Sequence, residues 1–379
     1  MTLRVSSAFD GGNAVVVEAT RADSIRLRIR KDAGDKFMQW FHFRVSGCRG
    51  EPIVVRLENA DKVSYRGGFV DYRAVASTNR KNWTRVETTF EGGVLEIRHQ
   101  SEADAVWFAY FAPYSMERHA DLVARSAADP RVQLEVLGAT VDGQDIDALH
   151  VGDGPLSIWC IARQHPGETM AEHWMEGFLD RLLDADDPVS RRLLNRARLH
   201  IVPNMNPDGS RRGHLRTNAT GANLNREWLE PTLERSPEVF LVRKRMHETG
   251  VNLCLDVHGD EELPFNFIAG ADGIPSLTDH QRTLLHRFRQ DLERISPDFQ
   301  TARGYPPAAP GEANLRMCTN YVAETFGCLA MTLEMPFKDA ANHPLPETGW
   351  SPRRSAHLGR SCLAAIDAIA DDLILDGGD

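Results

Sequence analysis

Four residues of the types that hold and use a metal ion stand far apart in this chain. His165 and Glu168 are three positions apart, and His258 and Glu334 follow much later. Two histidines and one carboxylate are the ligand set of an open catalytic zinc site. A glutamate left over has the chemistry of a general base that activates water. These residue types together indicate metal-dependent hydrolysis.

Each of these residues is expected near the carboxyl end of a buried strand. Residues 156–162 form an apolar run that ends just before His165, and residues 251–257 form a second one that ends just before His258. A third apolar run leads into Glu334. Open α/β sheets place their ligands at this edge. Three separate strands are therefore predicted to converge on one site.

The turn after the first strand is expected to bring two side chains onto one metal. Pro166 and Gly167 are predicted to turn the chain into a helix that carries Glu168 or begins just after it. A lone His-x-x-Glu is a weak signal, since any amphipathic helix start can show it as a surface pair. Asp256 points to the same side of its strand as His258, which predicts that it orients this histidine from behind.

The chain changes character near residue 115, which divides it into two predicted domains. Residues 1–114 contain short alternating runs separated by Gly, Asn and Asp, without a helical period, and therefore predict an antiparallel β-sandwich. Residues 115–379 alternate apolar runs with amphipathic helices, which predicts an α/β domain with a largely parallel or mixed sheet. Strands are expected near residues 15–19, 24–29, 39–45, 53–57, 156–162, 199–203, 251–257 and 328–333, and helices at residues 169–183 and 237–248.

Composition narrows the function classes. A formal net charge of −10 and the lack of a basic segment disfavour nucleic acid as a partner. The amino terminus has no apolar run behind a positive start, and no later stretch approaches membrane-spanning length, so we expect a cytoplasmic protein without a membrane partner. The six cysteines stand singly, so they are expected to be reduced and structural.

A second group of motifs lies between the two histidines and makes a family resemblance specific. Together with the His-Pro-Gly-Glu turn, the late histidine and Thr-Leu-Glu, these motifs resemble those of zinc metallocarboxypeptidases, and the chain is identified as a bacterial-type member of the cytosolic carboxypeptidase branch, which includes deglutamylases. Residues 39–45 and 111–115 resemble the amino-terminal β-sandwich of that branch. The intervening motifs are Asn204-Met205-Asn206-Pro207-Asp208-Gly209, Leu215-Arg216-Thr217-Asn218 and Asn223-Leu224-Asn225-Arg226-Glu227-Trp228.

The resemblance implies a fold, a cofactor and roles for named residues. The fold would be a carboxypeptidase-like α/β/α domain behind the smaller sandwich. His165, Glu168 and His258 would bind one Zn²⁺ per chain. Arg216 would polarise the scissile carbonyl, and Glu334 would be the general base.

Substrate contacts are implied in the same way. Asn225 and Arg226 would hold the terminal carboxylate, for which a planar guanidinium offers two parallel charge-assisted hydrogen bonds. The family also uses a mobile tyrosine, for which Tyr305, in an expected proline-rich loop, is preferred over Tyr321. An acidic side chain in the pocket would need a cation, here assigned to Arg316. Other cations near the motifs are Arg303, Lys338, Arg211 and Arg212.

The predicted function is release of a carboxy-terminal residue, expected to be glutamate, from a peptide or protein. One alternative is an amidohydrolase of the succinylglutamate desuccinylase and aspartoacylase type. Such enzymes resemble this domain in their zinc motif and their basic carboxylate clamp, but they act on a small N-acyl amino acid. The sandwich and the run between the histidines favour the peptidase. A second alternative is a peptide-binding module without catalysis, but such a module has no need of a general base.

Overall fold

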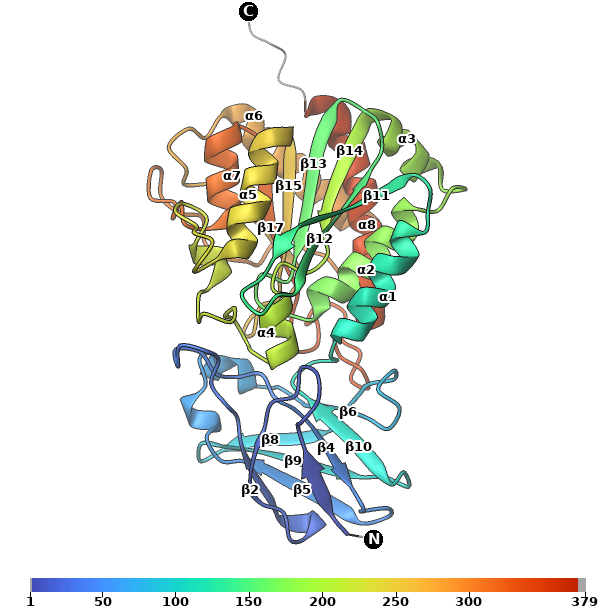
Figure 1. The fold of residues 1–379 in the computed structure, drawn as a ribbon, viewed down its shortest axis with the longest axis vertical. Helices are drawn as coiled ribbons and strands as arrows, with labels where there is room; N and C mark the ends of the chain where they lie inside the picture. Colours follow the sequence, from blue (N-terminus) through green and yellow to red (C-terminus); the bar gives the residue numbers. More distant parts are fainter. Residues whose placement is uncertain (1, 374–379) are drawn as a thin grey trace, which may run out of the picture.

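The computed structural model describes residues 2–373, which form an all-β part and an α/β part. In Figure 1 the two β-sheets built from the first third of the chain lie below the helices and sheet of the remainder. Residues 110–115 connect the last strand of the lower part to the first helix of the upper part. The α/β class and the sheet domain in front of it are those predicted.

The amino-terminal part contains two sheets, each five-stranded within the described residues. One sheet has the order β1 (Arg4–Ser6), β4 (His42–Ser46), β10 (Ala105–Ala109), β6 (Val75–Ser77) and β7 (Thr84–Arg85). The other has the order β2 (Val15–Glu18), β3 (Ile25–Arg28), β5 (Pro52–Leu57), β9 (Val94–Gln100) and β8 (Glu87–Glu91).

One strand pair departs from the predicted antiparallel arrangement. β3 and β5 pair in parallel, with Ile25 opposite Val55, whereas the other pairs of these two sheets are antiparallel. The strand between them in sequence, β4, belongs to the other sheet. The chain therefore crosses to the second sheet and returns before it forms β5, and such a crossover gives neighbouring strands the same direction.

The α/β part is built on a mixed sheet. Its strands follow the order β11 (Val132–Ala139), β12 (Asp145–Val151), β14 (Ala197–Val202), β13 (Leu156–Ala162), β15 (Leu253–Val257), β17 (Leu329–Glu334) and β16 (Phe267–Gly270). The pairs of β13 with β14 and β15, and of β15 with β17, are parallel, and the outer pairs are antiparallel.

Helices cover both faces of this sheet (Figure 1). The helices are α1 (Met116–Ala127), α2 (Met170–Leu182), α3 (Pro188–Arg196), α4 (Pro207–Arg212), α5 (Pro237–Thr249), α6 (Asp279–Ile295), α7 (Cys318–Phe326) and α8 (Pro352–Ile369). Single turns of 3-10 helix lie at Ala22–Ser24, Ala60–Lys62, Arg66–Phe69, Leu224–Arg226 and Ala370–Asp372. The apolar side chains of α2, α6 and α8 share one core, and those of α5 and α7 share the core on the opposite face.

The central strands bring the predicted site residues to one edge. All seven residues of β13 are buried, as expected for a parallel strand covered on both faces. Ala162 at its end lies opposite Val257, and Val257 lies opposite Leu333. Because the three strands end at the same level, the segments that follow them emerge side by side.

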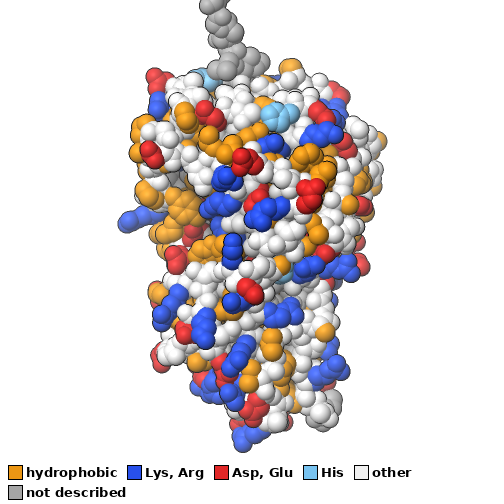
Figure 2. Space-filling view, turned by 60° about the vertical axis from the view of Figure 1, so that its left-hand side comes forward, with side chains coloured by type: hydrophobic (Ala, Val, Ile, Leu, Met, Phe, Trp, Pro, Cys, Tyr) orange, Lys and Arg blue, Asp and Glu red, His pale blue; other side chains and the backbone are white. Residues whose placement is uncertain are grey.

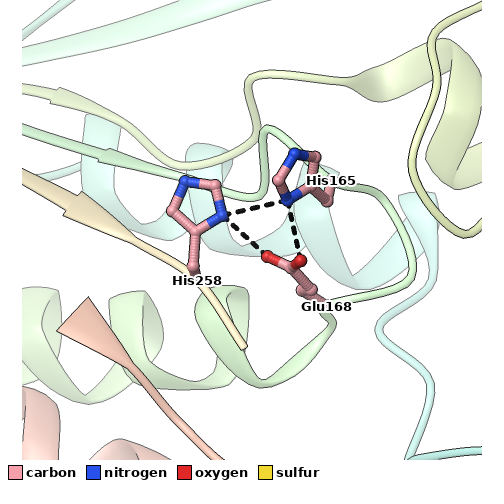
Figure 3. A group of neighbouring side chains, drawn as sticks. All are labelled: His165, Glu168 and His258. Carbon is pink, nitrogen blue, oxygen red and sulfur yellow. Dashed lines mark hydrogen bonds and ion pairs between the residues drawn. The ribbon is translucent and has the colours of Figure 1, made fainter. Parts of the chain in front are cut away.

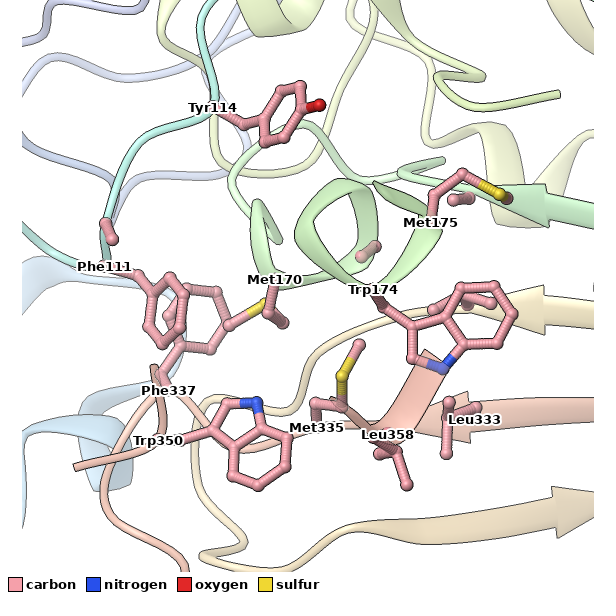
Figure 4. Close-up of a cluster of buried hydrophobic side chains, with 14 of the residues drawn as sticks. Phe111, Tyr114, Met170, Trp174, Met175, Leu333, Met335, Phe337, Trp350 and Leu358 are labelled. Carbon is pink, nitrogen blue, oxygen red and sulfur yellow. The ribbon is translucent and has the colours of Figure 1, made fainter. Parts of the chain in front are cut away.

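Aromatic side chains join the two parts of the molecule. Figure 4 shows Phe111, Phe337 and Trp350 gathered beside α2. The ring of Tyr110, which follows β10, stacks on Phe337 with centroids 4.6 Å apart. Arg85 of β7 reaches the same place and donates to the carbonyl of Phe337 at 2.6 Å. The contact between the two parts is thus both apolar and hydrogen-bonded.

Two expectations about composition can be compared with the structure. The six cysteines are buried free thiols. Within residues 2–373, none of the helices combines the length and the apolar character needed to cross a bilayer.

Candidate metal centre and substrate cavity

His165, Glu168 and His258 meet at the carboxyl edge of the central strands (Figure 3). His165 and Glu168 lie in the turn between β13 and α2, which begins at Met170, after Glu168. His258 directly follows β15. All three side chains are buried, and their nearest ligand atoms lie within 4.8 Å of one another. The structure therefore brings together the three residues that the motif comparison assigned to zinc.

The outer nitrogen of each histidine has an acceptor, which fixes the direction of its proton. Nε2 of His165 donates to Oδ1 of Asn223 at 3.0 Å, and Nε2 of His258 donates to Oδ2 of Asp256 at 2.9 Å. In the neutral form of each imidazole, Nδ1 then carries the lone pair that can bind a metal. Metal-binding histidines are held in this manner, with the second ring nitrogen donating to a carboxylate or carbonyl oxygen.

The inner atoms of the three side chains face one another. The Nδ1 atoms of His165 and His258 are 3.1 Å apart, Nδ1 of His165 is 2.7 Å from Oε1 of Glu168, and Nδ1 of His258 is 2.8 Å from Oε2 of Glu168. When both imidazoles are neutral, these atoms are acceptors directed at one another, and either a proton on Nδ1 of His258 or a metal cation between them resolves their repulsion. Two imidazoles and a carboxylate fit Zn²⁺, around which such donors lie at about 2.0–2.2 Å.

Burial and neighbouring charges set the protonation of this group. Burial and the Arg216 guanidinium lower the pKa of His165 to about 3, which keeps this imidazole neutral. Burial favours the neutral form of Glu168, but the two histidines hold the pKa of its carboxyl below its usual range. Burial also disfavours a charged His258, yet Asp256 and Glu168 raise its pKa well above the usual value. Since a zinc ligand must be deprotonated, protons compete with the metal here.

A glycine allows the loop of Arg216 to approach the histidine turn. The N–H of Gly167 donates to the carbonyl oxygen of Leu215 at 2.9 Å. A Cβ atom at Gly167 would lie 2.9 Å from that oxygen and 3.0 Å from Cα of Leu215. Any larger residue would push the two loops apart, so the Pro-Gly pair sets the distance between Arg216 and the metal centre.

Glu334 and Tyr305 lie beside the metal centre. Glu334 is the last residue of β17 and is buried, and burial raises the pKa of its carboxyl well above the usual range. Its Oε2 atom has no hydrogen-bond partner among the described residues. The hydroxyl of Tyr305 donates to Oδ2 of Asp260 and lies 3.4 Å from Oε1 of Glu334. Tyr321 instead lies away from the cavity, 3.0 Å from Nε2 of His247.

Arg216, Asn225 and Arg226 line the same cavity. Nη1 of Arg216 is 3.8 Å from Oε1 of Glu168. Oδ1 of Asn225 accepts the backbone N–H of Cys318 at 2.8 Å, so its Nδ2 group is directed elsewhere. Nη1 of Arg226 donates to the carbonyl of Asn225 at 2.6 Å, which fixes the guanidinium against its own backbone.

The cavity has a volume of about 770 Å³ and extends from the metal centre to β16 and α6. Charges of both signs line it, and Figure 2 shows Lys, Arg, Asp and Glu side chains intermixed over the face that includes the side of α5 and α7. Arg289 of α6 lines it and donates from Nη2 to the carbonyl of Ile268 at 2.8 Å. Asp272, after β16, also lines it.

The cation assigned to substrate side chains from the sequence lies elsewhere. Arg316 is half-exposed and pairs with Glu230 at 2.9 Å, outside the residues that line the cavity. Arg316 follows a loop that reaches the cavity, but its side chain points away from the cavity. The distance in sequence from a motif does not determine the direction of a side chain. Of the other cations, Arg303 lines the cavity, Lys338 donates to Gly67 at the contact between the two parts, and Arg212 pairs with Asp142.

Several residues of the site were not identified from the sequence. Asn223 lies two positions before Asn225 in a quoted motif, but an asparagine carries no metal-site signal by itself. Gln164 donates from Nε2 to Asp256 at 2.6 Å and accepts Nε1–H of Trp228 at 2.8 Å, so it supports the acceptor of His258. Asp260, which accepts the hydroxyl of Tyr305, is two positions after His258. This closeness in sequence was the one feature that could have indicated its place in the site.

Comparisons with known proteins agree with this geometry. Residues 5–111 match the model of the cytosolic carboxypeptidase N-terminal domain, and residues 118–354 match that of the zinc carboxypeptidase family. Mouse cytosolic carboxypeptidase 6 is 27% identical over 301 residues, which span 71% of this chain and 55% of the mouse protein.

Two solved bacterial structures are similar over nearly the full chain. A metallo-carboxypeptidase from Burkholderia cenocepacia is 47% identical with a TM-score of 0.95, covering 98% of this chain and 100% of that one. The metallo-carboxypeptidase from Pseudomonas aeruginosa, solved with (2-guanidinoethylmercapto)succinic acid, is 46% identical with a TM-score of 0.95 and the same coverage. The chain therefore belongs to the zinc carboxypeptidase family, with a cytosolic carboxypeptidase N-terminal domain in front of the catalytic domain.

Proposed function

We propose that this chain is a zinc-dependent metallocarboxypeptidase that hydrolyses the carboxy-terminal peptide bond of a peptide or protein and releases glutamate. The observation that carries the proposal is that one cavity is lined by His165 and Glu168 of the metal centre and also by Glu334, Arg216 and Arg226. A water activator, a carbonyl-polarising cation and a carboxylate anchor in one cavity are the parts that an exopeptidase needs. A peptide-binding module without catalysis needs no residue that activates water.

The chain's own residues provide the acid–base and electrostatic steps. Zn²⁺, when bound by His165, Glu168 and His258, would act as a Lewis acid on the carbonyl and lower the pKa of water toward neutrality. Glu334 takes the proton of the attacking water and delivers it to the leaving amine. The Arg216 guanidinium stabilises the negative charge that develops on the carbonyl oxygen.

The terminal carboxylate is held farther along the cavity. Arg226 presents a guanidinium that its own backbone fixes in place, and it can form two parallel charge-assisted hydrogen bonds with a carboxylate. Asn225 has its oxygen committed to Cys318, which leaves its Nδ2 group as a donor. These contacts orient a chain end and exclude a continuing chain, which makes the enzyme an exopeptidase.

Arg289 supports the preference for glutamate. It lines the cavity beyond the residues used for the carbonyl and the carboxylate. Burial lowers the pKa of its guanidinium, and Asp272 partly offsets that effect. A half-buried cation with one backbone acceptor is suited to a second carboxylate, as on a glutamate side chain.

Asp272 favours a second candidate, release of a basic residue. Its carboxylate lines the same cavity as Arg289. The Pseudomonas aeruginosa relative was solved with a compound that carries a guanidino group as well as succinic acid. The two candidates differ only in which of the two side chains faces the substrate.

A peptide panel separates these possibilities. Peptides ending in several glutamates, in lysine or in leucine, together with N-acetylglutamate and succinylglutamate, would be incubated with the zinc-loaded protein, and each released amino acid would be measured with and without a chelator. The Glu334→Gln variant controls for contaminating peptidases. Glutamate release from the acidic peptide alone is expected. Release of lysine selects the second candidate, and cleavage of only the N-acyl amino acids would show an amidohydrolase.

Two substitutions locate the specificity. Arg289→Gln is expected to raise KM for the glutamate-ending peptide without changing kcat/KM for the leucine-ending one. Asp272→Asn is the matched control and should leave the glutamate activity in place. The reverse pattern, with Asp272→Asn abolishing release of lysine, would establish basic specificity.

Zinc content and location belong to the same proposal. We expect one zinc per chain, measured as the metal-to-protein ratio after dialysis. A ratio near two would reveal a second metal site. The names of the cytosolic relatives support a cytoplasmic location, which fractionation of cells expressing the chain would test.

A further inference from the structure

The loop that carries Arg216 is anchored to the amino-terminal domain. Asp32 lies between β3 and β4 and is 3% exposed. Its carboxylate accepts the backbone N–H groups of Leu215 at 2.7 Å, Arg216 at 2.7 Å and Thr217 at 3.0 Å. The hydroxyl of Thr217 also lies within 3.3 Å of it. One carboxylate from the first domain thus holds three consecutive peptide groups of the second.

The same domain also contacts the guanidinium of Arg216. The ring centroids of Tyr65 and Phe37 lie 5.3 and 5.7 Å from its central carbon. Tyr65 lines the substrate cavity, and Gln39 fixes it by accepting its N–H at 2.8 Å and donating to its carbonyl at 3.0 Å. Aromatic faces hold a guanidinium without consuming its N–H donors.

The remaining contacts of Arg216 leave its donors available. Among residues 2–373, no side-chain or backbone group accepts a hydrogen bond from this guanidinium, and Glu168 lies 3.8 Å away as an ion-pair partner. A long side chain with such loose contacts depends on its backbone for its position. A displacement of about 1 Å at a reacting centre can lower the rate about 100-fold.

We propose that Asp32 is a positioning residue for peptide hydrolysis, which makes the amino-terminal domain part of the catalytic unit. Asp32 fixes the peptide groups of residues 215–217, and Tyr65 and Phe37 then direct the Arg216 guanidinium to the scissile carbonyl. The inference rests on the proposed function, because it assigns to Arg216 the role of polarising that carbonyl.

A double-mutant cycle tests the proposal. Asp32→Asn, Arg216→Ala and the double variant would be compared in kcat and KM on the peptide that the wild type cleaves, with zinc content and Tm measured for each. Asp32→Asn is expected to lower kcat about 10–100-fold while KM changes little. In the Arg216→Ala background the same substitution should lower kcat less than about twofold, since the two residues act through one contact. Equal effects in the two backgrounds would overturn the proposal.

Asn13 provides a matched control at the same contact between domains. Its Nδ2 group donates to the carbonyl of Gly213 at 2.9 Å, three residues before Arg216. Asn13→Ala removes this hydrogen bond between domains, and two more to the backbone of Arg30 within the first domain, without touching the peptide groups that Asp32 holds. It should lower Tm and leave kcat within about twofold of wild type. A kcat loss equal to that of Asp32→Asn would show that any weakening of the domain contact has this effect, which contradicts a specific role.

Hydrogen exchange gives a readout that does not depend on turnover. The amides of residues 215–217 should be protected in the wild type, and Asp32→Ala should remove that protection while the amides of β13 keep theirs. Rapid exchange of these amides in the wild type would overturn the proposal by itself. Absence of turnover by the wild type on every peptide would instead contradict the proposed function, and the exchange data would still decide whether Asp32 holds the loop.

Discussion

Two buried clusters of histidine and carboxylate lie on either side of the turn after β13, and only one of them has the geometry of a metal site. The metal cluster consists of His165, Glu168, His258 and Asp256, and the support cluster consists of Arg163, Glu172, His119 and Asp147. Both contain charged groups that burial alone would make costly. Composition and burial therefore do not separate a metal site from a structural ion network.

The direction of the protons separates them. In the support cluster each oxygen of Glu172 faces a donor: Oε1 lies 2.7 Å from Nδ1 of His119, and Oε2 accepts from Arg163 and, at 3.2 Å, from Asn204. In the metal cluster the two Nδ1 atoms and the two oxygens of Glu168 face one another, so either a proton on His258 or a metal ion has to lie among them. Burial lowers the pKa of His165 to about 3, whereas two carboxylates outweigh burial at His258 and raise its pKa, as two carboxylates raise that of His119 to about 9.

The sharpest test of the metal cluster as a reaction centre uses Glu334. The Glu334→Gln variant should lose activity by about 10³-fold or more, because an amide cannot take the proton of the attacking water. Zinc content and Tm should stay at wild-type values, since Glu334 lies outside the ligand set. Activity and bound zinc would be measured on the same preparation. Substantial residual turnover would remove Glu334 from the role of general base.

The same substitution of Glu168 and of Glu172 compares the two clusters directly in their effect on zinc binding. Glu168→Gln should weaken zinc binding by more than about 100-fold, because it changes a ligand itself. Removal of a residue that only supports a ligand lowers metal affinity by up to about 100-fold. Glu172→Gln should leave zinc affinity within about tenfold of wild type. Competition with a chromogenic chelator measures both. If Glu172→Gln weakened zinc binding as much as Glu168→Gln, the two clusters would act as one.

Much of this contrast could be predicted from the sequence, because the metal cluster follows local rules. The apolar runs at residues 156–162 and 251–257 place strand ends correctly, and His165 and His258 follow those ends. The strand that ends at Glu334 was predicted for the same reason. Parallel register then brings the three ends together without further information.

The support cluster and the specificity residues could not be predicted in that way. His119 and Glu172 lie on two different helices, α1 and α2, and their contact depends on how those helices pack. Asp32 reaches Arg216 across a domain boundary. Arg316 was assigned from its place in sequence, but the direction of an exposed side chain is set by its neighbour Glu230. Periodicity specifies which face is buried, not which distant side chains meet.

The support cluster should be detected as stability rather than as chemistry. Glu172→Gln leaves Arg163 and His119 buried without their common anion, which is expected to cost about 3–5 kcal/mol in the free energy of unfolding. Denaturant titration of the metal-free protein measures this cost. Glu168→Gln, titrated under the same metal-free conditions, is the control and should cost less, because His258 keeps Asp256 as an ion-pair partner, whereas Arg163 has no other such partner among the described residues. A larger loss for Glu168→Gln would reverse the comparison.

The smallest effect is a pH dependence of the stability that the support cluster provides. His119 faces Glu172 from α2 and Asp147 from β12, and its pKa of about 9 in the folded protein lies above the unfolded value near 6.5. The charged histidine therefore stabilises the fold fully below about pH 6.5, and this contribution is lost as pH rises through about 9. His119→Gln should cost about 2–3 kcal/mol more at pH 6 than at pH 10, measured as the difference in unfolding free energy from wild type at each pH. A cost that is the same at both pH values would mean that His119 is neutral in the folded protein, and Arg163 would then neutralise Glu172 without a contribution from His119.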